Sequence, residues 1–233
     1  MATTSYKWNS YESLMKVFED KDDDGFVVTF STPIDESLAP VLFWKPSDQP
    51  YGFLGNWYPS EIVVEGVKYT CTEQYIMAQK ALLFNDQETY SKIMSTNDPY
   101  TQKKLGRVVS PFDLSVWVRY SKGILFKCCL AKFTQHKHLG AMLLETGLAP
   151  IAEASPLDAI YGIGLSEDAA DAKDPRKWKH HGESKYIFSS GMFVNFYYYY
   201  FVLLVDNLGE CLMEVRSYLR KGHWNDDGTF VKG

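Results

Sequence analysis

The sequence predicts a mainly α-helical fold with a small antiparallel β-sheet, as a single compact domain. Three observations predict this class. Apolar residues recur at helical spacing over most of residues 71–146. Valine and isoleucine flank a turn at Glu65-Gly66, the pattern of a β-hairpin. Of the 233 residues, 45% are hydrophobic, which is enough to bury one large core.

The expected elements follow one another along the chain with clear interruptions. A short strand at 26–30 precedes a proline-rich stretch, and the hairpin occupies 61–69. Gly106 and Gly147 stand where helix C-terminal caps are expected. Helices are predicted at residues 71–83, 86–95, 99–106, 115–133, 137–146 and 208–220.

The domain is expected at residues 41–221, between an N-terminal extension at 1–40 and a C-terminal tail at 222–233. An apolar, tyrosine-rich insertion at about 183–205 interrupts it. Its charge-free stretch from Tyr186 to Val205 has the length of a membrane span, but four consecutive tyrosines in its middle disfavour that reading.

Composition limits the function classes. The net charge of −5 argues against general electrostatic binding to nucleic acid, although a nucleotide can still be recognised in a pocket. The four cysteines form no CxxC pair and the N-terminus has no secretory signal, so we expect a soluble cytoplasmic or nuclear protein. No metal site or cofactor is expected, because the histidines form no ligand set and the acidic turn at 20–25 lacks the last ligand of a calcium loop.

The helix predicted at 71–83 carries two opposite charges in its apolar stripe. Glu73 and Lys80 are seven residues apart, which separates their Cα atoms by about 10 Å along the axis. One explanation is a capping box, in which Glu73 bonds back to the backbone N–H of Thr70. That explanation leaves Lys80 unaccounted for. The other explanation is a ligand pocket between the two charges.

Two further stretches have the composition of a binding site. Residues 155–164 combine a proline, Asp158, Tyr161 and two glycines, which suits a rigid loop with close backbone approach at Gly162 and Gly164. They lack the third glycine of a dinucleotide fingerprint. Residues 53–59 place Asn56 beside aromatic surface.

These stretches, in this order, resemble the NADAR family, also called YbiA-like proteins, over about residues 43–220. The motifs that carry the resemblance are Gly55-Asn-Trp-Tyr-Pro59, Glu73-Gln-Tyr-Ile-Met-Ala-Gln-Lys80, Leu105-Gly-Arg107, Val116-Trp117, Ser155-Pro-Leu-Asp-Ala-Ile-Tyr-Gly-Ile-Gly164, Trp178 and Leu208-Gly-Glu-Cys-Leu-Met-Glu-Val-Arg216.

The resemblance implies a YbiA-like fold and N-glycosidase chemistry on ADP-ribose-like substrates. The substrate expected is ADP-ribosylated guanine, free or in DNA or RNA. Phosphoribosylated riboflavin-pathway intermediates are the alternative, and so is a non-catalytic module that binds ADP-ribose or NAD. No stable membrane partner is expected.

The resemblance also implies roles for particular residues. Glu73 and Asp158 match acidic positions of the family and are the expected catalytic carboxyls. Lys80 is expected to be catalytic too, by an alternative route in which its amine attacks C1 of the ring-opened sugar to form a Schiff base. Substrate binding is expected from Asn56, Tyr58, Arg107, Trp117, Tyr161, Gly162 and Gly164. Trp117 fits core packing equally well.

Overall fold

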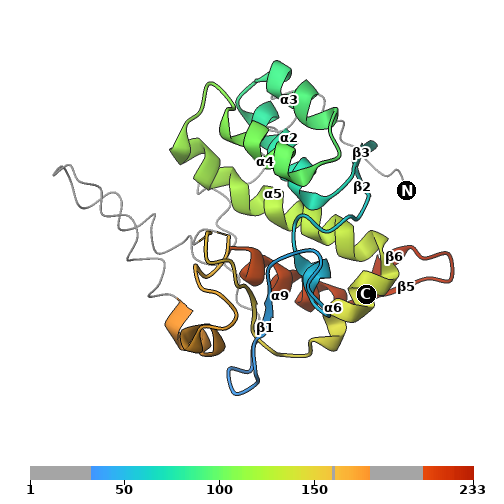
Figure 1. Ribbon diagram of the computed structural model, residues 1–233. Helices are drawn as coiled ribbons and strands as arrows, with labels where there is room; N and C mark the ends of the chain where they lie inside the picture. Colours follow the sequence, from blue (N-terminus) through green and yellow to red (C-terminus); the bar gives the residue numbers. More distant parts are fainter. Residues whose placement is uncertain (1–32, 159–160, 179–206) are drawn as a thin grey trace.

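Helix α5 (Leu114–Gln135) runs through the middle of the molecule, and the other elements pack on its two sides (Figure 1). The computed structural model describes residues 33–158, 161–178 and 207–233. Asp113 begins α5 by accepting hydrogen bonds from the backbone N–H groups of Ser115 and Val116. The buried side of α5 supplies much of the core, including Ile124, Leu125 and Phe133.

Three helices form one side of the molecule, and α2 (Thr72–Leu83) packs against both of the others and against α5. Asp86 and Asp98 cap the starts of α3 (Gln87–Met94) and α4 (Pro99–Arg107). Gly106 was expected to cap the end of α4, but it lies within the last turn of that helix. A Cβ at this position would come within 1.9 Å of Met77 Sδ on α2. The glycine therefore serves the close approach of α4 to α2.

On the other side of α5 lie α6 (Lys137–Glu145) and α9 (Asn207–Leu219). Gly147 ends the α6 region with a φ of 58°, as expected of a C-terminal cap glycine. The buried Arg216 of α9 donates hydrogen bonds to Thr146 Oγ1 and to the backbone oxygen of Ala149, both at 2.8 Å. This guanidinium fastens α9 to the connection that leads from α6 into β4.

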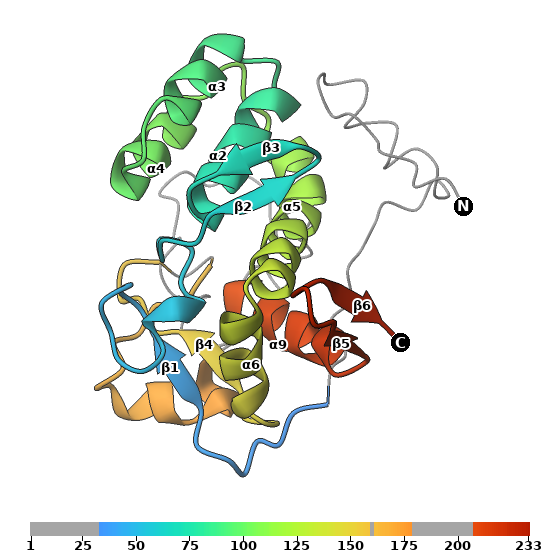
Figure 2. The same ribbon diagram turned by 90° about the vertical axis from the view of Figure 1, so that its right-hand side faces the viewer.

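The strands form three separate pairs (Figure 2). The predicted hairpin is present as β2 (Ile62–Val64) and β3 (Val67–Tyr69), antiparallel about Glu65 and Gly66, both with positive φ. A second antiparallel pair, β5 (Gly222–Trp224) and β6 (Phe230–Lys232), lies in residues expected as a tail. The third pair, β1 (Val41–Phe43) and β4 (Ile151–Glu153), is parallel, which the sequence-based expectation of an antiparallel sheet missed.

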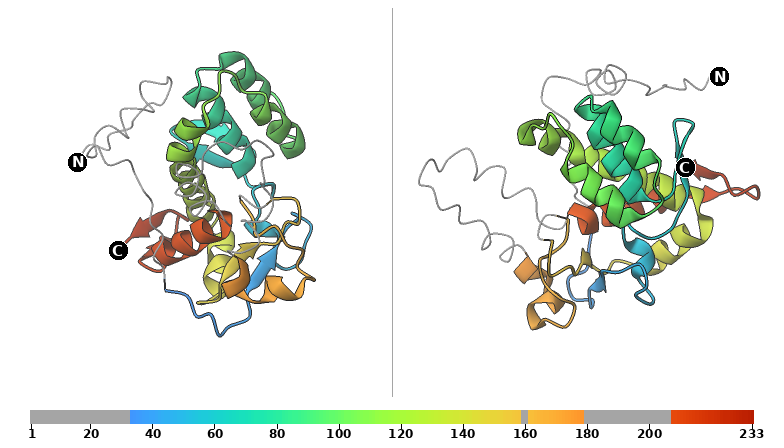
Figure 3. Two further views of the ribbon diagram at one scale, coloured as in Figure 1. Left: turned by 90° about the vertical axis from the view of Figure 1, so that its left-hand side faces the viewer. Right: turned by 45° about the horizontal axis from the view of Figure 1, so that its top comes forward.

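Three single turns of 3₁₀-helix complete the described fold: η1 (Gly52–Leu54), η2 (Ala170–Lys173) and η3 (Pro175–Lys177). Figure 3 shows η2 and η3 at the end of the molecule far from α3. There the buried Trp178 indole donates a hydrogen bond to the backbone oxygen of Ala172 at 2.9 Å.

The mainly α prediction is confirmed, with helices close to the predicted ranges. The strand expected at 26–30 and the apolar run at 186–205 lie outside the described residues. Among those that are described, no helix is both long and apolar enough to cross a bilayer.

Candidate active site

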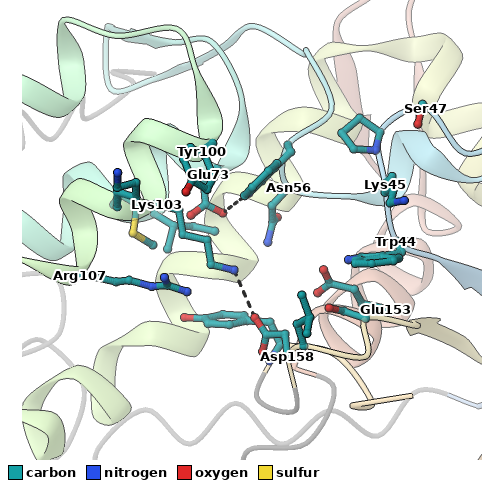
Figure 4. Close-up of a pocket in the computed structure, with 18 residues that line it drawn as sticks. Trp44, Lys45, Ser47, Asn56, Glu73, Tyr100, Lys103, Arg107, Glu153 and Asp158 are labelled. Atoms are coloured by element: carbon teal, nitrogen blue, oxygen red, sulfur yellow. Dashed lines mark hydrogen bonds and ion pairs between the residues drawn. The ribbon is translucent and has the colours of Figure 1, made fainter. Parts of the chain in front are cut away.

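A cavity of about 590 Å³ opens where α2 and α4 face the end of β4 and the loop that follows it (Figure 4). This volume lies within the range of small-molecule sites. Aromatic, acidic and basic side chains all reach it. The lining residues are Trp44, Lys45, Pro46, Ser47, Asn56, Trp57, Glu73, Ile76, Met77, Tyr100, Lys103, Lys104, Arg107, Glu153, Ser155, Leu157, Asp158 and Tyr161.

Glu73 lies in the first turn of α2 and faces the cavity. Of the two explanations for Glu73, the capping box is wrong: the side-chain oxygen of Gln74, not of Glu73, accepts the backbone N–H of Thr70, at 2.7 Å. Glu73 Oε2 instead accepts the indole N–H of Trp57 at 3.2 Å. Within the described residues, Oε1 is buried and has no hydrogen-bond partner. An oxygen left in this state beside a cavity is placed to take its partner from a ligand.

Burial raises the pKa of Glu73 from 4.5 to about 7. Lys103, the Trp57 indole and Arg107 oppose this rise, whereas the negative charge of Asp158 adds to it. Both protonation states of Glu73 are therefore accessible near neutral pH, as acid–base catalysis requires.

A tight turn at Gly55–Tyr58 supports Glu73. The Tyr58 backbone N–H donates to Gly55 O at 3.2 Å, which leaves Asn56 and Trp57 at the two central positions. Asn56 O accepts the backbone N–H of Glu73 at 3.1 Å, one of the N–H groups that has no partner within a helix. Asn56 Oδ1 accepts the hydroxyl of Thr72 at 2.9 Å. The turn thus fixes the start of α2.

Asp158 lies on the opposite wall and is joined to α4. Its Oδ2 lies 3.3 Å from Lys103 Nζ, and its Oδ1 accepts the backbone N–H of Tyr161 at 2.9 Å. The Lys103–Asp158 ion pair crosses the cavity between its two walls, as Figure 4 shows. Lys103 is therefore the cation closest to the predicted acids.

The two glycines of the loop shape its backbone. A Cβ on Gly162 would come within 2.5 Å of Glu153 O, so only glycine allows this approach to the end of β4. Gly164 has a φ of 68° and donates its N–H to Asp158 O at 3.1 Å. Neither glycine lines the cavity. In the described structure they hold the loop of Asp158.

Glu153, the last residue of β4, is a third carboxyl on the same cavity. Its pKa is raised from 4.5 to about 8, mainly by burial and also by the charges of Asp158 and Glu73, while Lys103 opposes the rise. Three acids around one cavity repel one another when ionised, so at least one is held protonated near neutral pH.

The mouth of the cavity is basic and aromatic although the whole chain is acidic. Lys103, Lys104 and Arg107 follow one another on α4, and Lys45 comes from the segment after β1. Trp57 and Tyr100 meet edge to face with ring centroids 6.4 Å apart, and Trp44 lies across from them. Such a mixture suits a ligand that carries phosphate and a flat ring.

The family model of the NADAR domain matches residues 42–185. The chain belongs to the NADAR family.

Several proteins are similar to this chain in sequence. The chain is 37% identical over 161 residues to protein irg-1 of Caenorhabditis elegans, covering 62% of this chain and 74% of that protein. It is 41% identical over 114 residues to N-glycosidase R617 of Acanthamoeba polyphaga mimivirus, covering 49% and 67%.

N-glycosidase YbiA of Escherichia coli is similar in both sequence and structure. It is 32% identical to this chain over 124 residues, which are 53% of this chain and 75% of YbiA. The NMR structure of YbiA superposes with a TM-score of 0.54 and 25% identity over 78% of this chain and 85% of that one. These relatives support a general N-glycosidase role, that of a hydrolase of N-glycosyl compounds.

Of the ten site residues expected from the NADAR resemblance, five line the cavity together: Asn56, Glu73, Arg107, Asp158 and Tyr161. Lys80 is not among the lining residues. Its Nζ lies 4.3 Å from the Phe112 ring centroid and 5.4 Å from that of Trp117. Burial lowers its pKa below the usual value of 10.5. The catalytic role of Lys80 stays a prediction.

Tyr58 and Trp117 also lie outside the lining. The Tyr58 ring covers the buried Lys132, whose Nζ is 5.5 Å from its centroid. Trp117 is half-buried and packs against the core, where its ring lies beside Lys80.

Sequence reasoning missed three polar groups of this NADAR site. Lys103 resembles any solvent-facing lysine of a helix, and Glu153 ends a three-residue strand that carries no motif. Trp57 lies within the Gly55–Pro59 motif, so this motif could have marked it as a site residue.

Among the described residues, no group of three or more His, Cys, Asp or Glu side chains is arranged to hold a metal ion.

Proposed function

We propose that this protein hydrolyses the N-glycosidic bond of ADP-ribosylated guanine, free or in nucleic acid, and releases ADP-ribose. One observation carries the proposal furthest. The buried, unpartnered Oε1 of Glu73 faces a cavity whose opposite wall presents Asp158 and Glu153. Carboxyls on both sides of a cavity are the arrangement that glycoside hydrolysis uses.

The chemistry asks for two events at one sugar carbon. The C1–N bond breaks with its electron pair going to the base nitrogen, which takes a proton from an acid. Positive charge then builds on the ribose until water adds to C1 and gives its proton to a carboxylate. Glu73 is suited to either task because its pKa is raised to about 7. Asp158, held as an ion pair with Lys103, supplies the fixed negative charge.

The cavity mouth supports a nucleotide with two phosphates. Arg107 offers the planar fork that binds phosphate oxygens, and Lys104 and Lys45 add positive charge nearby. Trp44, Trp57 and Tyr100 offer aromatic surface for a base.

A covalent route through Lys80 is part of the proposal. Burial lowers the pKa of this amine, which raises the fraction able to attack a carbonyl-like C1. Lys80 packs beside Trp117, with its Nζ 5.4 Å from the centroid of that ring. A movement of these aromatic side chains would be needed for contact with the sugar.

The test is release of free ADP-ribose from ADP-ribosyl-guanosine and from an ADP-ribosylated single-stranded oligonucleotide, measured by mass spectrometry. We expect release by the unmodified protein and almost none by Glu73→Gln. Glu88→Gln is the matched control, because Glu88 is an exposed acid whose ion pair with Lys92 lies away from the cavity. This control should keep full activity.

The same assay decides between the alternatives. Release of the base from a phosphoribosylated riboflavin-pathway intermediate, with no action on either guanine substrate, would transfer the activity to that substrate. Tight binding of ADP-ribose without turnover of any of the three compounds would make the protein a binding module and overturn the proposal.

A further inference from the structure

Lys132 is a buried lysine that the proposed chemistry does not use. It lies on the core side of α5, is 1% exposed, and is among the largest fully buried side chains. In the described part of the chain no ion pair joins it to a carboxylate, and the ionisable groups around it are the thiols of Cys71, Cys128 and Cys129. Burial lowers its pKa to about 8.

Such a lysine is costly for the fold. An ammonium removed from water without a counter-ion loses several kcal/mol of hydration, and an apolar side chain of similar shape fills the same space without that loss. The faces of Tyr58 and Phe133, with centroids 5.5 and 5.3 Å from Nζ, compensate in part. Packing alone therefore does not explain the ammonium.

Within the described residues, the hydrogen bond of the Lys132 side chain leads towards the active site. Its Nζ donates to Gly55 O at 3.0 Å. The same carbonyl accepts the Tyr58 N–H that closes the Gly55–Tyr58 turn, so both of its lone pairs are used. A charged donor makes this contact stronger than a neutral one would.

The turn held in this way carries two side chains of the cavity. Asn56 and Trp57 stand at its centre, and both lead to Glu73 by hydrogen bonds. The path from Lys132 Nζ to the carboxyl of Glu73 thus runs through Gly55 O, the turn and the Trp57 indole. Every contact along it is within 3.2 Å.

We propose that Lys132 is a positioning residue of the active site, which anchors the Gly55–Tyr58 turn so that Trp57 keeps its hydrogen bond to Glu73. Its effect on turnover rests on the function proposed above, but its effect on Glu73 does not. Lys132 itself does not touch substrate, since it is absent from the cavity lining.

The test follows the ionisation of Glu73 through the ¹⁵N NMR resonance of the Trp57 indole N–H. The resonance is assigned by its loss in the variant Trp57→Phe. In the unmodified protein this resonance should titrate with Glu73. In Lys132→Met the turn loosens, the indole exchanges faster with solvent, and the midpoint rises by about 0.5–1 unit because a hydrogen bond to the carboxylate is lost. The other titratable groups that act on Glu73 are unchanged by this substitution: Lys103, Arg107, Glu153, Asp158 and Tyr161.

The matched control is Leu125→Ala, a cavity-forming change on the same helix. It should lower the melting temperature more than Lys132→Met while leaving the indole midpoint in place. Turnover should fall about 10- to 100-fold in Lys132→Met if the proposed function holds.

An unchanged midpoint and exchange rate in Lys132→Met would overturn the proposal. If that variant does not fold, Lys132→Gln replaces it, because its side chain is one bond too short to reach Gly55 O. Failure of both to fold would make Lys132 a structural residue and would equally overturn the proposal. The NMR readout needs no activity, so an inactive unmodified protein would refute the proposed function while still deciding the role of Lys132.

Discussion

The two ends of α2 bury opposite charges in different ways. At its start, Glu73 has one oxygen bound to the Trp57 indole and the other buried without a recorded partner beside the cavity. Two turns later, Lys80 lies half-buried against the rings of Phe112 and Trp117. Both side chains lie on the apolar stripe of one helix, yet only Glu73 lines the cavity.

The two charged side chains of α2 therefore differ in how their surroundings hold them. The carboxyl is fixed by a hydrogen-bonded turn and keeps one acceptor open, which is the state of a group waiting for a ligand. The amine lies against two aromatic rings, and its burial there lowers its pKa. If both ends act in one reaction, substitutions at each should abolish turnover but differ in every other measurement.

The largest effect is expected at Glu73. Glu73→Gln keeps the shape and the acceptor for Trp57 but removes the titrating carboxyl, so kcat should fall about 10²–10⁴-fold. Steady-state release of ADP-ribose measures this, with circular dichroism to establish that the fold is kept. Wild-type turnover in this variant would reduce Glu73 to a structural acid.

Lys80→Met tests the other end of α2. If the amine attacks the sugar, turnover should fall about as far as in Glu73→Gln, and borohydride should trap an adduct on the unmodified protein but not on the variant. Lys92→Met serves as a control because Lys92 is an exposed lysine of α3 paired only with Glu88. Trapping at another lysine, or at none, would remove Lys80 from the mechanism.

The free energy of unfolding should depend on pH because the Glu73 carboxyl is buried. Because the folded-state pKa of Glu73 is about 7 against 4.5 when unfolded, the folded state binds the proton more tightly between these values. Stability is therefore lost as pH rises from 4.5 to 7, by up to about 3 kcal/mol. Glu73→Gln, which cannot ionise, should be more stable than the unmodified protein by about that amount at pH 8 in urea unfolding, with the gap closing towards pH 4.5. A constant gap at all pH values would contradict the raised pKa.

The smallest effect is expected where the ion pair crosses the cavity. Lys103→Met removes the partner of Asp158 and one charge of the mouth, so KM should rise about tenfold with a smaller change in kcat. The control is Lys104→Met, which removes a neighbouring charge but leaves the ion pair with Asp158 in place. Equal effects of the two variants would mean that Lys103 acts only through its positive charge and not through its ion pair with Asp158.

The sequence predicted the elements that depend on neighbours along the chain. Helical periodicity located the helices, and the Glu65-Gly66 turn located the β2–β3 hairpin, because both are set by local spacing. The Glu73 and Asp158 motifs pointed to one cavity because their order matched a family. What these residues do there stays a prediction.

Features that depend on distant contacts could not be predicted. Gln74 replaced Glu73 as the partner of Thr70, a choice set by what α2 packs against. Lys132 has the sequence signature of an ordinary helix lysine, and its burial follows only from the position of the Gly55 turn. Glu153 reaches the cavity through a parallel pairing that no local pattern encodes.

That parallel pairing of β1 with β4 joins Val41 to Ile151 and brings Trp44 and Glu153, which are 109 residues apart in the sequence, to one cavity. Translation must therefore pass Tyr161, the last residue of the cavity lining, before the pocket can close. Two fragments divided at the exposed end of α6 would each lack a wall, and only their reassociation would restore ligand binding. The fold is in this sense a natural candidate for a split reporter of nucleotide signals.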